Sequence, residues 1–423
     1  MLRALRNLAF ATAASCLALS VAAPAYAQTT LKFVSWQKDE PGVMDWWAAM
    51  VQKFEETHPD VKIEWTKVAR SSFVDTMTTL FAGGTPPDIV HLAAFEFQQF
   101  ANNGWLEDLG PYVESAGLDL NGWTGQSACE YQDQTVCLML LYTGYVMAYN
   151  QELFDSEGIA VPTNWDEYLA AIQALTKDTN GDNIPDQFGT GHDTAGGGSQ
   201  YITEVMNYTL DTGARFTDAD GKITINTPEM IEGLSRWKTV VKDGLTPRDL
   251  PSADIRQLFS DGRIAIRLDG PQIWPIAAAS PNADKLKLAD VPFTAPVGGG
   301  SNVLAMASEI SDENKKLVWE FIALAASDEM QSAYAAAVSS PAPSPRADMS
   351  EARAKVEPFD IIANAAKRAS DAGIDRLPKG LEIQFNEFTK MMKDEAQRMI
   401  IEDLDPAAVA ETMQQKAEAI QAQ

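Results

Sequence analysis

Oxygen-bearing side chains recur between Asp178 and Asp186 at a spacing that suits a bound cation. Carboxylate or amide groups stand at positions 1, 3, 5 and 9 of this run, and a backbone carbonyl would serve position 7. A calcium loop of the EF-hand type has this order of oxygen ligands, with a glutamate at position 12 where this chain has Gly189. The pattern predicts a structural Ca²⁺ site, with a polar turn as the alternative. The predicted ligands are Asp178, Asn180, Asp182, the carbonyl of Ile184, and Asp186.

Two cysteines, Cys129 and Cys137, are separated by seven residues. An oxidising compartment favours a disulfide bond between such a pair, which would close a short hairpin. The neighbouring residues include no histidine, and two thiols alone do not form a zinc site. We therefore predict a structural disulfide bond between Cys129 and Cys137.

Motifs of the common hydrolase and nucleotide-binding sites do not occur in the sequence. It has no G-x-S-x-G, H-E-x-x-H or Walker A pattern, and its three histidines, His58, His91 and His192, are far apart. We predict that the protein is not an enzyme and needs no cofactor beyond the candidate calcium ion. Because paired carboxylates can hydrolyse glycosides, a secreted carbohydrate-active hydrolase stays a minor alternative.

The hydrophobic pattern predicts strands that alternate with helices, an order typical of a parallel, doubly wound α/β sheet. A nearly continuous apolar run at 137–150 predicts one long extended segment. Asn164 followed by Glu167 predicts a capped helix. The first expected elements are strands at 31–36, 61–65 and 89–92, with helices that begin near Pro41, Phe73 and Phe95.

The N-terminus has the features of a secretory signal peptide. Arg3 and Arg6 precede an apolar run, and Ala25-Tyr26-Ala27 has small residues at the two positions that signal peptidase reads. We predict that residues 1–27 are this signal, that cleavage follows Ala27, and that the mature protein is periplasmic. No other stretch reaches the roughly 18 apolar residues that a membrane helix needs.

The chain is strongly acidic, with 59 Asp and Glu residues against 33 Lys and Arg residues and a formal net charge of −26. This surface charge argues against a nucleic-acid partner, because phosphate backbones are bound by basic surfaces. A length of 423 residues exceeds what one hydrophobic core usually serves, so two domains are expected.

Five short motifs follow one another in a characteristic order along the chain. They are Phe54–Ile63, Ala82–Ile89, Tyr149–Phe154, Pro162–Glu167 and Phe259–Ile266. Together they resemble the motifs of the family 1 extracellular solute-binding proteins, the group that includes maltose-binding protein and serves ABC sugar importers. The resemblance extends over nearly all of the chain after the signal peptide.

The resemblance implies a two-lobed periplasmic-binding-protein fold of type II. Each lobe would be a doubly wound, mainly parallel sheet with flanking helices, and hinge strands would join the lobes. A ligand would bind between the lobes and favour their closure. The implied boundaries are 28–141 plus 293–326 for the N-terminal lobe, 146–290 plus 330–423 for the C-terminal lobe, and hinges near 141–146, 290–294 and 325–330.

The ligand is expected beyond the carboxyl ends of the strands, where open α/β sheets bind their ligands. Aromatic rings there can stack on the apolar faces of a sugar, planar polar groups can bind its hydroxyls, and glycines allow close backbone approach. The predicted ligand-binding residues are Trp36, Gln37, Arg70, Ser71, Glu96, Tyr142, Thr143, Tyr145, His192, Asp193, Gly270, Gln272, Trp274, Gly299, Gly300 and Ser301.

The resemblance implies a periplasmic substrate-binding component that delivers a sugar or sugar derivative to the permease subunits of an ABC transporter, as a monomer. A receptor for an anionic sugar derivative or a glycerol-phosphate-type ester is the alternative. A sensor that docks a membrane receptor would have the same features. The maltose branch has an aromatic residue after its Gly-Pro pair, but Gln272 stands there in this chain, and Phe95-Glu96 replaces an acidic–basic pair. These departures argue against maltose itself.

Overall fold

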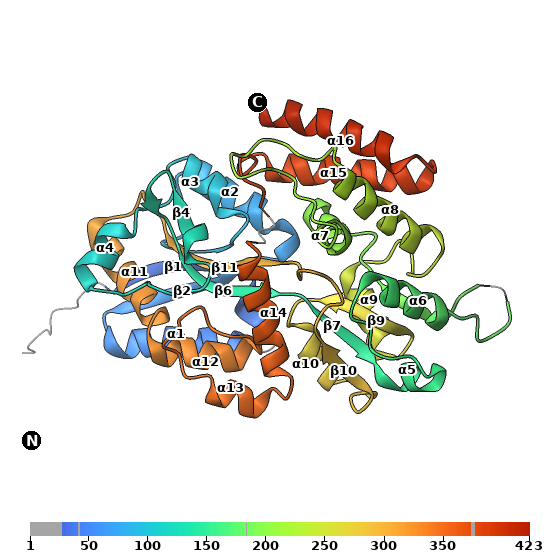
Figure 1. Cartoon of the computed structure of the whole chain (residues 1–423). Helices are drawn as coiled ribbons and strands as arrows, with labels where there is room; N and C mark the ends of the chain where they lie inside the picture. The colour runs from blue at the N-terminus through green and yellow to red at the C-terminus, as the bar shows by residue number, and fades with distance from the viewer. Residues whose placement is uncertain (1–27, 41–42, 183, 374–376) are drawn as a thin grey trace, which may run out of the picture.

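A computed structural model describes residues 28–40, 43–182, 184–373 and 377–423. The predicted signal peptide, residues 1–27, therefore lies outside the described residues, as does the side chain of Ser71. Two mixed sheets, each with its own hydrophobic core and flanking helices, form the two halves of the molecule (Figure 1). This arrangement confirms the predicted two-lobed α/β fold.

The first sheet has the strand order β2-β1-β3-β11-β6. Strand β1 pairs in parallel with β2 and β3, whereas β11 runs antiparallel to both β3 and β6. Its strands are β1 Thr29–Ser35, β2 Val61–Lys67, β3 Ile89–Ala93, β6 Leu138–Gly144 and β11 Gly298–Met306. The helices of this half are α1 Met44–Thr57, α2 Phe73–Ala82, α3 Phe97–Asn102, α4 Gly110–Ala116, α11 Asp312–Ala325, α12 Asp328–Val338 and α13 Ser350–Lys355.

The second sheet has the order β10-β7-β9-β8. Its strands are β7 Val146–Asn150, β8 Phe188–Gly191, β9 Ile264–Asp269 and β10 Leu286–Ala289. Its helices are α5 Gln151–Glu157, α6 Trp165–Leu175, α7 Gly198–Thr209, α8 Pro228–Lys242, α9 Ser252–Ser260, α10 Ile273–Ala278, α15 Phe385–Ile401 and α16 Pro406–Gln421. Strands β8 and β9 are parallel, but β7 runs antiparallel to both β9 and β10, so this sheet is less parallel than expected.

The chain passes from the first sheet to the second through Tyr145, which separates β6 from β7. The helix α14 (Phe359–Asp371) packs across β6 and β11 beside this crossing (Figure 1). Gly144 makes the contact possible, because a Cβ atom there would lie 2.1 Å from the carbonyl oxygen of Ala365. The lobe boundaries and hinges expected from the sequence stay a prediction.

A short hairpin, β4 (Glu130–Tyr131) and β5 (Gln134–Thr135), projects from the first half. The predicted disulfide bond between Cys129 and Cys137 is present at its base, and both cysteines are buried. The tip residues Gln132 and Asp133 have φ values of 47° and 64°, which a tight turn requires. The disulfide bond therefore closes a loop that has very little sheet pairing of its own.

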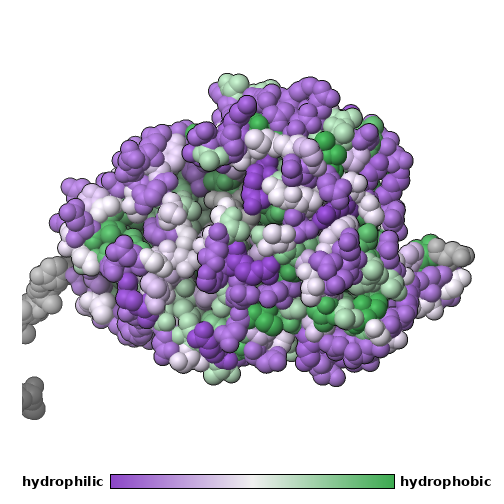
Figure 2. Space-filling model, in the orientation of Figure 1, coloured by the Kyte–Doolittle hydropathy of each residue, from purple (hydrophilic) through white to green (hydrophobic). Residues whose placement is uncertain are grey.

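The face of the molecule in Figure 2 is largely hydrophilic, with apolar residues in small separate patches. Among the described residues, no helix combines the length and apolar character needed to span a bilayer.

Candidate ligand-binding cleft

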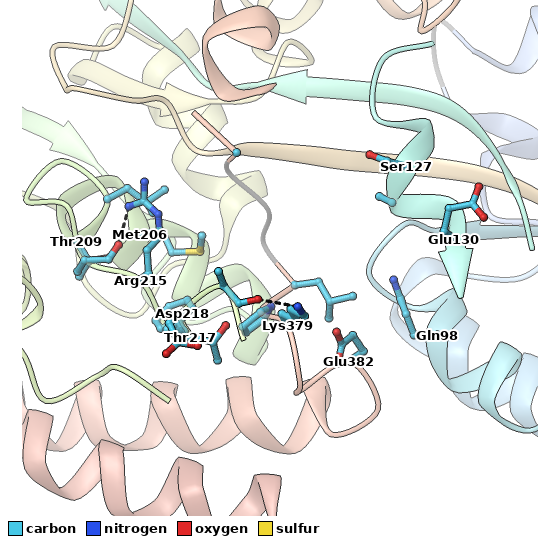
Figure 3. Close-up of a pocket in the computed structure, with 18 of the residues that line it drawn as sticks. Gln98, Ser127, Glu130, Met206, Thr209, Arg215, Thr217, Asp218, Lys379 and Glu382 are labelled. Atoms are coloured by element: carbon cyan, nitrogen blue, oxygen red, sulfur yellow. Dashed lines mark hydrogen bonds between the residues drawn. The ribbon is translucent and has the colours of Figure 1, made fainter. Parts of the chain in front are cut away.

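Two adjoining cavities lie between the two halves of the molecule and share Met206 and Phe216 in their walls. The inner cavity has a volume of about 200 Å³. The outer cavity, of about 670 Å³, has Gln98, Ser127 and Glu130 on one side and α7 with the loop after it on the other (Figure 3). The inner cavity is lined mainly by Phe95, Tyr145, Ser199, Gln200, Thr203, Glu204, Ser252, Arg256, Gln272, Phe385 and Thr389.

On the side of the first half, Arg70 follows β2 and Glu96 follows β3, next to Phe95 of the inner cavity. The two side chains form an ion pair, and the guanidinium lies 4.9 Å from the ring centre of Trp36. That ring also stacks on His91 at 4.1 Å. Burial lowers the pKa of His91 to about 3, and the charge of Arg70 adds to this effect, so the imidazole is neutral. Burial raises the pKa of Glu96, and Arg70 opposes that rise.

On the side of the second half, Asp269 at the carboxyl end of β9 lies behind Arg256 and Gln272, which line the inner cavity. Arg256, from α9, donates to both carboxylate oxygens, from Nε at 2.8 Å and from Nη2 at 2.9 Å. The Nε group of Arg267 donates at 3.0 Å, and Nε2 of Gln272 donates at 2.9 Å. Burial acts to raise the pKa of Asp269, but the charges of Arg267 and Arg256 outweigh it and hold the pKa well below its usual range.

A buried polar chain continues from Arg267 into the core of the second half. Arg267 Nη2 lies 2.8 Å from Oε1 of Glu204, and the other oxygen of that carboxylate lies 2.7 Å from Nδ1 of His192. The Nε2 atom of His192 contacts the hydroxyl of Tyr208 at 2.7 Å. The pKa of Glu204 lies below its usual value, because Arg267 and His192 lower it by more than burial raises it. The carboxylate therefore stays ionised beside its partners.

The family model for bacterial extracellular solute-binding proteins matches residues 38–332. This chain belongs to that family. A relative from Brucella abortus is 26% identical over 281 residues, which are 64% of this solute-binding protein and 65% of the relative. The match therefore spans slightly less than two thirds of the relative's length.

Two solved structures show the same fold as this solute-binding protein. The GacH receptor of Streptomyces glaucescens, solved unliganded and with acarbose, has a TM-score of 0.77 at 16% identity, covering 93% of this chain and 99% of the receptor. UgpB of Mycobacterium tuberculosis, in complex with glycerophosphocholine, has a TM-score of 0.75 at 14% identity, covering 92% and 98%.

Part of the predicted set meets at the cleft of the solute-binding protein. Tyr145 and Gln272 line the inner cavity, next to Phe95. Arg70 lies beside the inner cavity, 6.0 Å from the ring centre of Phe95. It pairs with Glu96 and lies over the ring of Trp36, so these three side chains form one group. Gly270 contributes its amide N–H, which donates to Asp269 at 2.8 Å.

Four other predicted residues are hydrogen-bonded to or packed against protein groups. His192 is fully buried in the polar chain, and Asp193 accepts hydrogen bonds from Ser252 at the start of α9. Gln37 accepts a hydrogen bond from Trp47. Trp274 packs against the smaller apolar cluster that contains Phe359 and Ile362.

The predicted residues of the crossing strands are also packed by protein groups. The ring of Tyr142 covers Gly125, and Thr143 is buried. A Cβ atom on Gly300 would lie 2.7 Å from Ala94 and Met139, and Gly299 has a φ of 133°. The carbonyl of Ser301 accepts the amide of Ala94. The small size of Gly300 therefore serves packing against the neighbouring strand and loop.

Sequence reasoning missed Arg256, Glu204 and Phe385, which line the inner cavity from three helices. It also missed Gln98 and Lys379, which line the outer cavity. A buried arginine in the strand β9 could have pointed to acidic partners, because an arginine is rarely buried unless it is paired.

The described residues of the candidate calcium loop are joined by turn hydrogen bonds. Asp178 accepts from the amide of Gly181 at 2.6 Å, and Asp182 accepts from the amide of Ile184 at 2.8 Å. The pKa of Asp186 is lowered by hydrogen bonds from Thr179. Within the described part of the chain, no three His, Cys, Asp or Glu side chains are grouped closely enough to hold a metal ion.

Proposed function

We propose that this protein is the periplasmic substrate-binding component of an ABC importer, and that it captures a sugar or sugar derivative between its lobes. The observation that carries the proposal is the inner cavity. It combines the rings of Phe95, Tyr145 and Phe385 with the planar polar groups of Arg256 and Gln272. Rings and planar hydrogen-bonding groups together are what a hydroxylated ring requires.

The two halves would act as lobes that close on the ligand, because the outer cavity has walls from both halves and Phe95 of the first half lines the inner cavity. Tyr145 lies both in the inner cavity and in the crossing between β6 and β7, so a bound ligand would contact the hinge itself. We further propose that the protein works as a monomer in the periplasm after cleavage behind Ala27, and that its partners are the permease subunits. The remaining sequence-predicted contacts, Trp274 among them, stay part of this proposal.

A receptor for an anionic sugar derivative or a glycerol-phosphate-type ester is the second candidate. The likeness in fold to UgpB, solved with glycerophosphocholine, favours keeping it. Catalysis is not part of the proposal, since the family consists of binding proteins.

A thermal-shift screen tests the function. At a ligand concentration of a hundred times Kd, binding adds about 2.7 kcal/mol to the folded state. At about 2–4 °C per kcal/mol, Tm should rise by about 5–10 °C with one class of sugar or polyol. Amino acids and short peptides serve as the control panel. A shift with those compounds alone, or hydrolysis products formed during incubation with a sugar, would contradict the proposal.

We also propose that the loop 178–186 binds structural Ca²⁺, which would add ion–oxygen bonds to the existing turn. Treatment with EDTA should then lower Tm by a few degrees, and excess Ca²⁺ should restore it. Asp186→Asn should abolish the response, while Asp218→Asn, in another polar turn, should keep it. An unchanged Tm after chelation would leave the plain polar turn as the explanation.

A further inference from the structure

Arg256 is the one arginine among the described residues that line the inner cavity. We propose that Arg256 determines specificity there by binding the hydroxyls of an uncharged ring, and that a buried relay of ion pairs, Glu204–Arg267–Asp269, holds it in place. The inference rests on the proposed function and deepens it, because it selects an uncharged group for this part of the ligand.

The relay fixes the guanidinium of Arg256 from one side. Asp269, whose side chain is 0% exposed, occupies Nε and Nη2 of Arg256 and leaves Nη1 outside this pair of bonds. The same carboxylate accepts from Gln272, another residue of the inner cavity. Arg256 and Gln272 therefore present N–H groups in a fixed relation to each other, as planar recognition of hydroxyls requires.

Asp269 is held in turn from behind. Arg267, which is 1% exposed, donates from Nε to Asp269 and from Nη1 to the carbonyl of Gly191 at 2.9 Å. Glu204 binds the Nη1 and Nη2 groups of the same guanidinium. Buried charges persist only when they are paired and hydrogen-bonded, so each member of the relay depends on the next.

Charge is balanced along this wall of the inner cavity. The signs alternate from Glu204 through Arg267 and Asp269 to Arg256, and Arg70, next to Phe95 of the cavity, is paired with Glu96. The carboxylate of Glu40 also lies near enough to interact with both Arg70 and Arg256. An anion in this cavity would lose its hydration and meet arginines that carboxylates already neutralise, whereas a hydroxyl needs no net charge.

The test compares matched neutral and anionic compounds. One panel contains glucose, galactose and maltotriose, and the other contains glucuronate, galacturonate and glucose 6-phosphate. Calorimetry should give the tighter Kd for a neutral compound, and the tightest neutral compound becomes the probe. Arg256→Lys and Glu204→Gln should each weaken its binding at least tenfold.

Matched controls separate positioning from general loss of structure. Arg353→Lys removes a guanidinium from an exposed ion pair, and Glu395→Gln removes a buried carboxylate that pairs with Arg398 and Lys416 on α15 and α16. Both controls should bind the probe as the wild type does. Monodeoxy analogues of the probe add a second readout. The analogue that lacks the recognised hydroxyl should bind Arg256→Lys and the wild type equally.

Tighter binding of an anionic compound, or wild-type affinity in Arg256→Lys, would overturn the inference and leave the proposed function intact. Binding by neither panel, or by amino acids alone, would remove the proposed function itself. If Glu204→Gln does not fold, Arg256→Lys decides alone, since its side chain is 24% exposed at the cavity wall.

Discussion

Asp269→Asn should lower the free energy of unfolding by about 3–5 kcal/mol, the usual effect of breaking a buried ion pair on one side. The variant keeps the shape of the side chain but leaves Arg256 and Arg267 without their shared carboxylate. Urea denaturation followed by tryptophan fluorescence measures the change as a shift of the midpoint. Asp360→Asn, which removes an exposed partner of Arg353, should cost less than about 1 kcal/mol.

The pH dependence of stability gives the same prediction a second readout. Because the pKa of Asp269 is lower in the folded state than the value of about 3.9 in an unfolded chain, its ionisation stabilises the fold at all pH values above about 4. That stabilisation is lost as the pH falls through the folded-state pKa. The gap between wild type and Asp269→Asn should therefore be full at pH 7 and narrow below pH 4. A gap that stays constant with pH would contradict this account.

Removal of the disulfide bond, in Cys129→Ser with Cys137→Ser, should cost about 2–3 kcal/mol of stability. The bond links residues eight positions apart, and the entropy of closing so short a loop in the unfolded chain gives this magnitude. Urea denaturation of the wild type with and without a thiol reductant measures it. Ser127, Glu130 and Gln132 of this hairpin region line the outer cavity, so the loss would loosen a wall of the cleft.

The double variant provides the control for that experiment. The reductant should leave its denaturation midpoint unchanged, because it contains no disulfide bond to reduce. Equal stability of the oxidised and reduced wild type would show that the hairpin is held by its other contacts, such as the hydrogen bond from Tyr131 to Asn102.

Local patterns in the sequence were sufficient for several single elements of both halves. The strand expected at 89–92 is β3, and the helix expected from Phe73 is α2. Asn164 caps α6 by accepting from the amide of Glu167. These features depend on residues that are close in the sequence, and the hydrophobic periodicity and the capping residues there predict them directly.

Strand direction in the second sheet could not be predicted in the same way. Every residue of β7 and β9 is buried, so neither strand shows an alternation that would reveal its partner or its direction. Burial on both faces looks the same in parallel and antiparallel pairs of this kind.

Tyr145 and Gln272, which were expected at the candidate cleft from their positions after strand ends, line the inner cavity, and their role in ligand binding stays a prediction. Arg256 reaches Asp269 from a separate helix, and Glu204 reaches Arg267 across 63 residues. No spacing rule connects such residues. Gly300 of β11 shows the converse, because its close packing against Ala94 and Met139 requires the same residue type as close approach of a ligand.

The alternating charges behind Arg256 also bear on how this protein can change over evolutionary time. A mutation that removes Glu204, Arg267 or Asp269 alone leaves an uncompensated charge in the interior and lowers stability, so we expect single changes there to be selected against. Replacement of the whole set by apolar residues would be tolerated by the fold. We therefore expect related proteins to keep Glu204, Arg267 and Asp269 together or to replace them together.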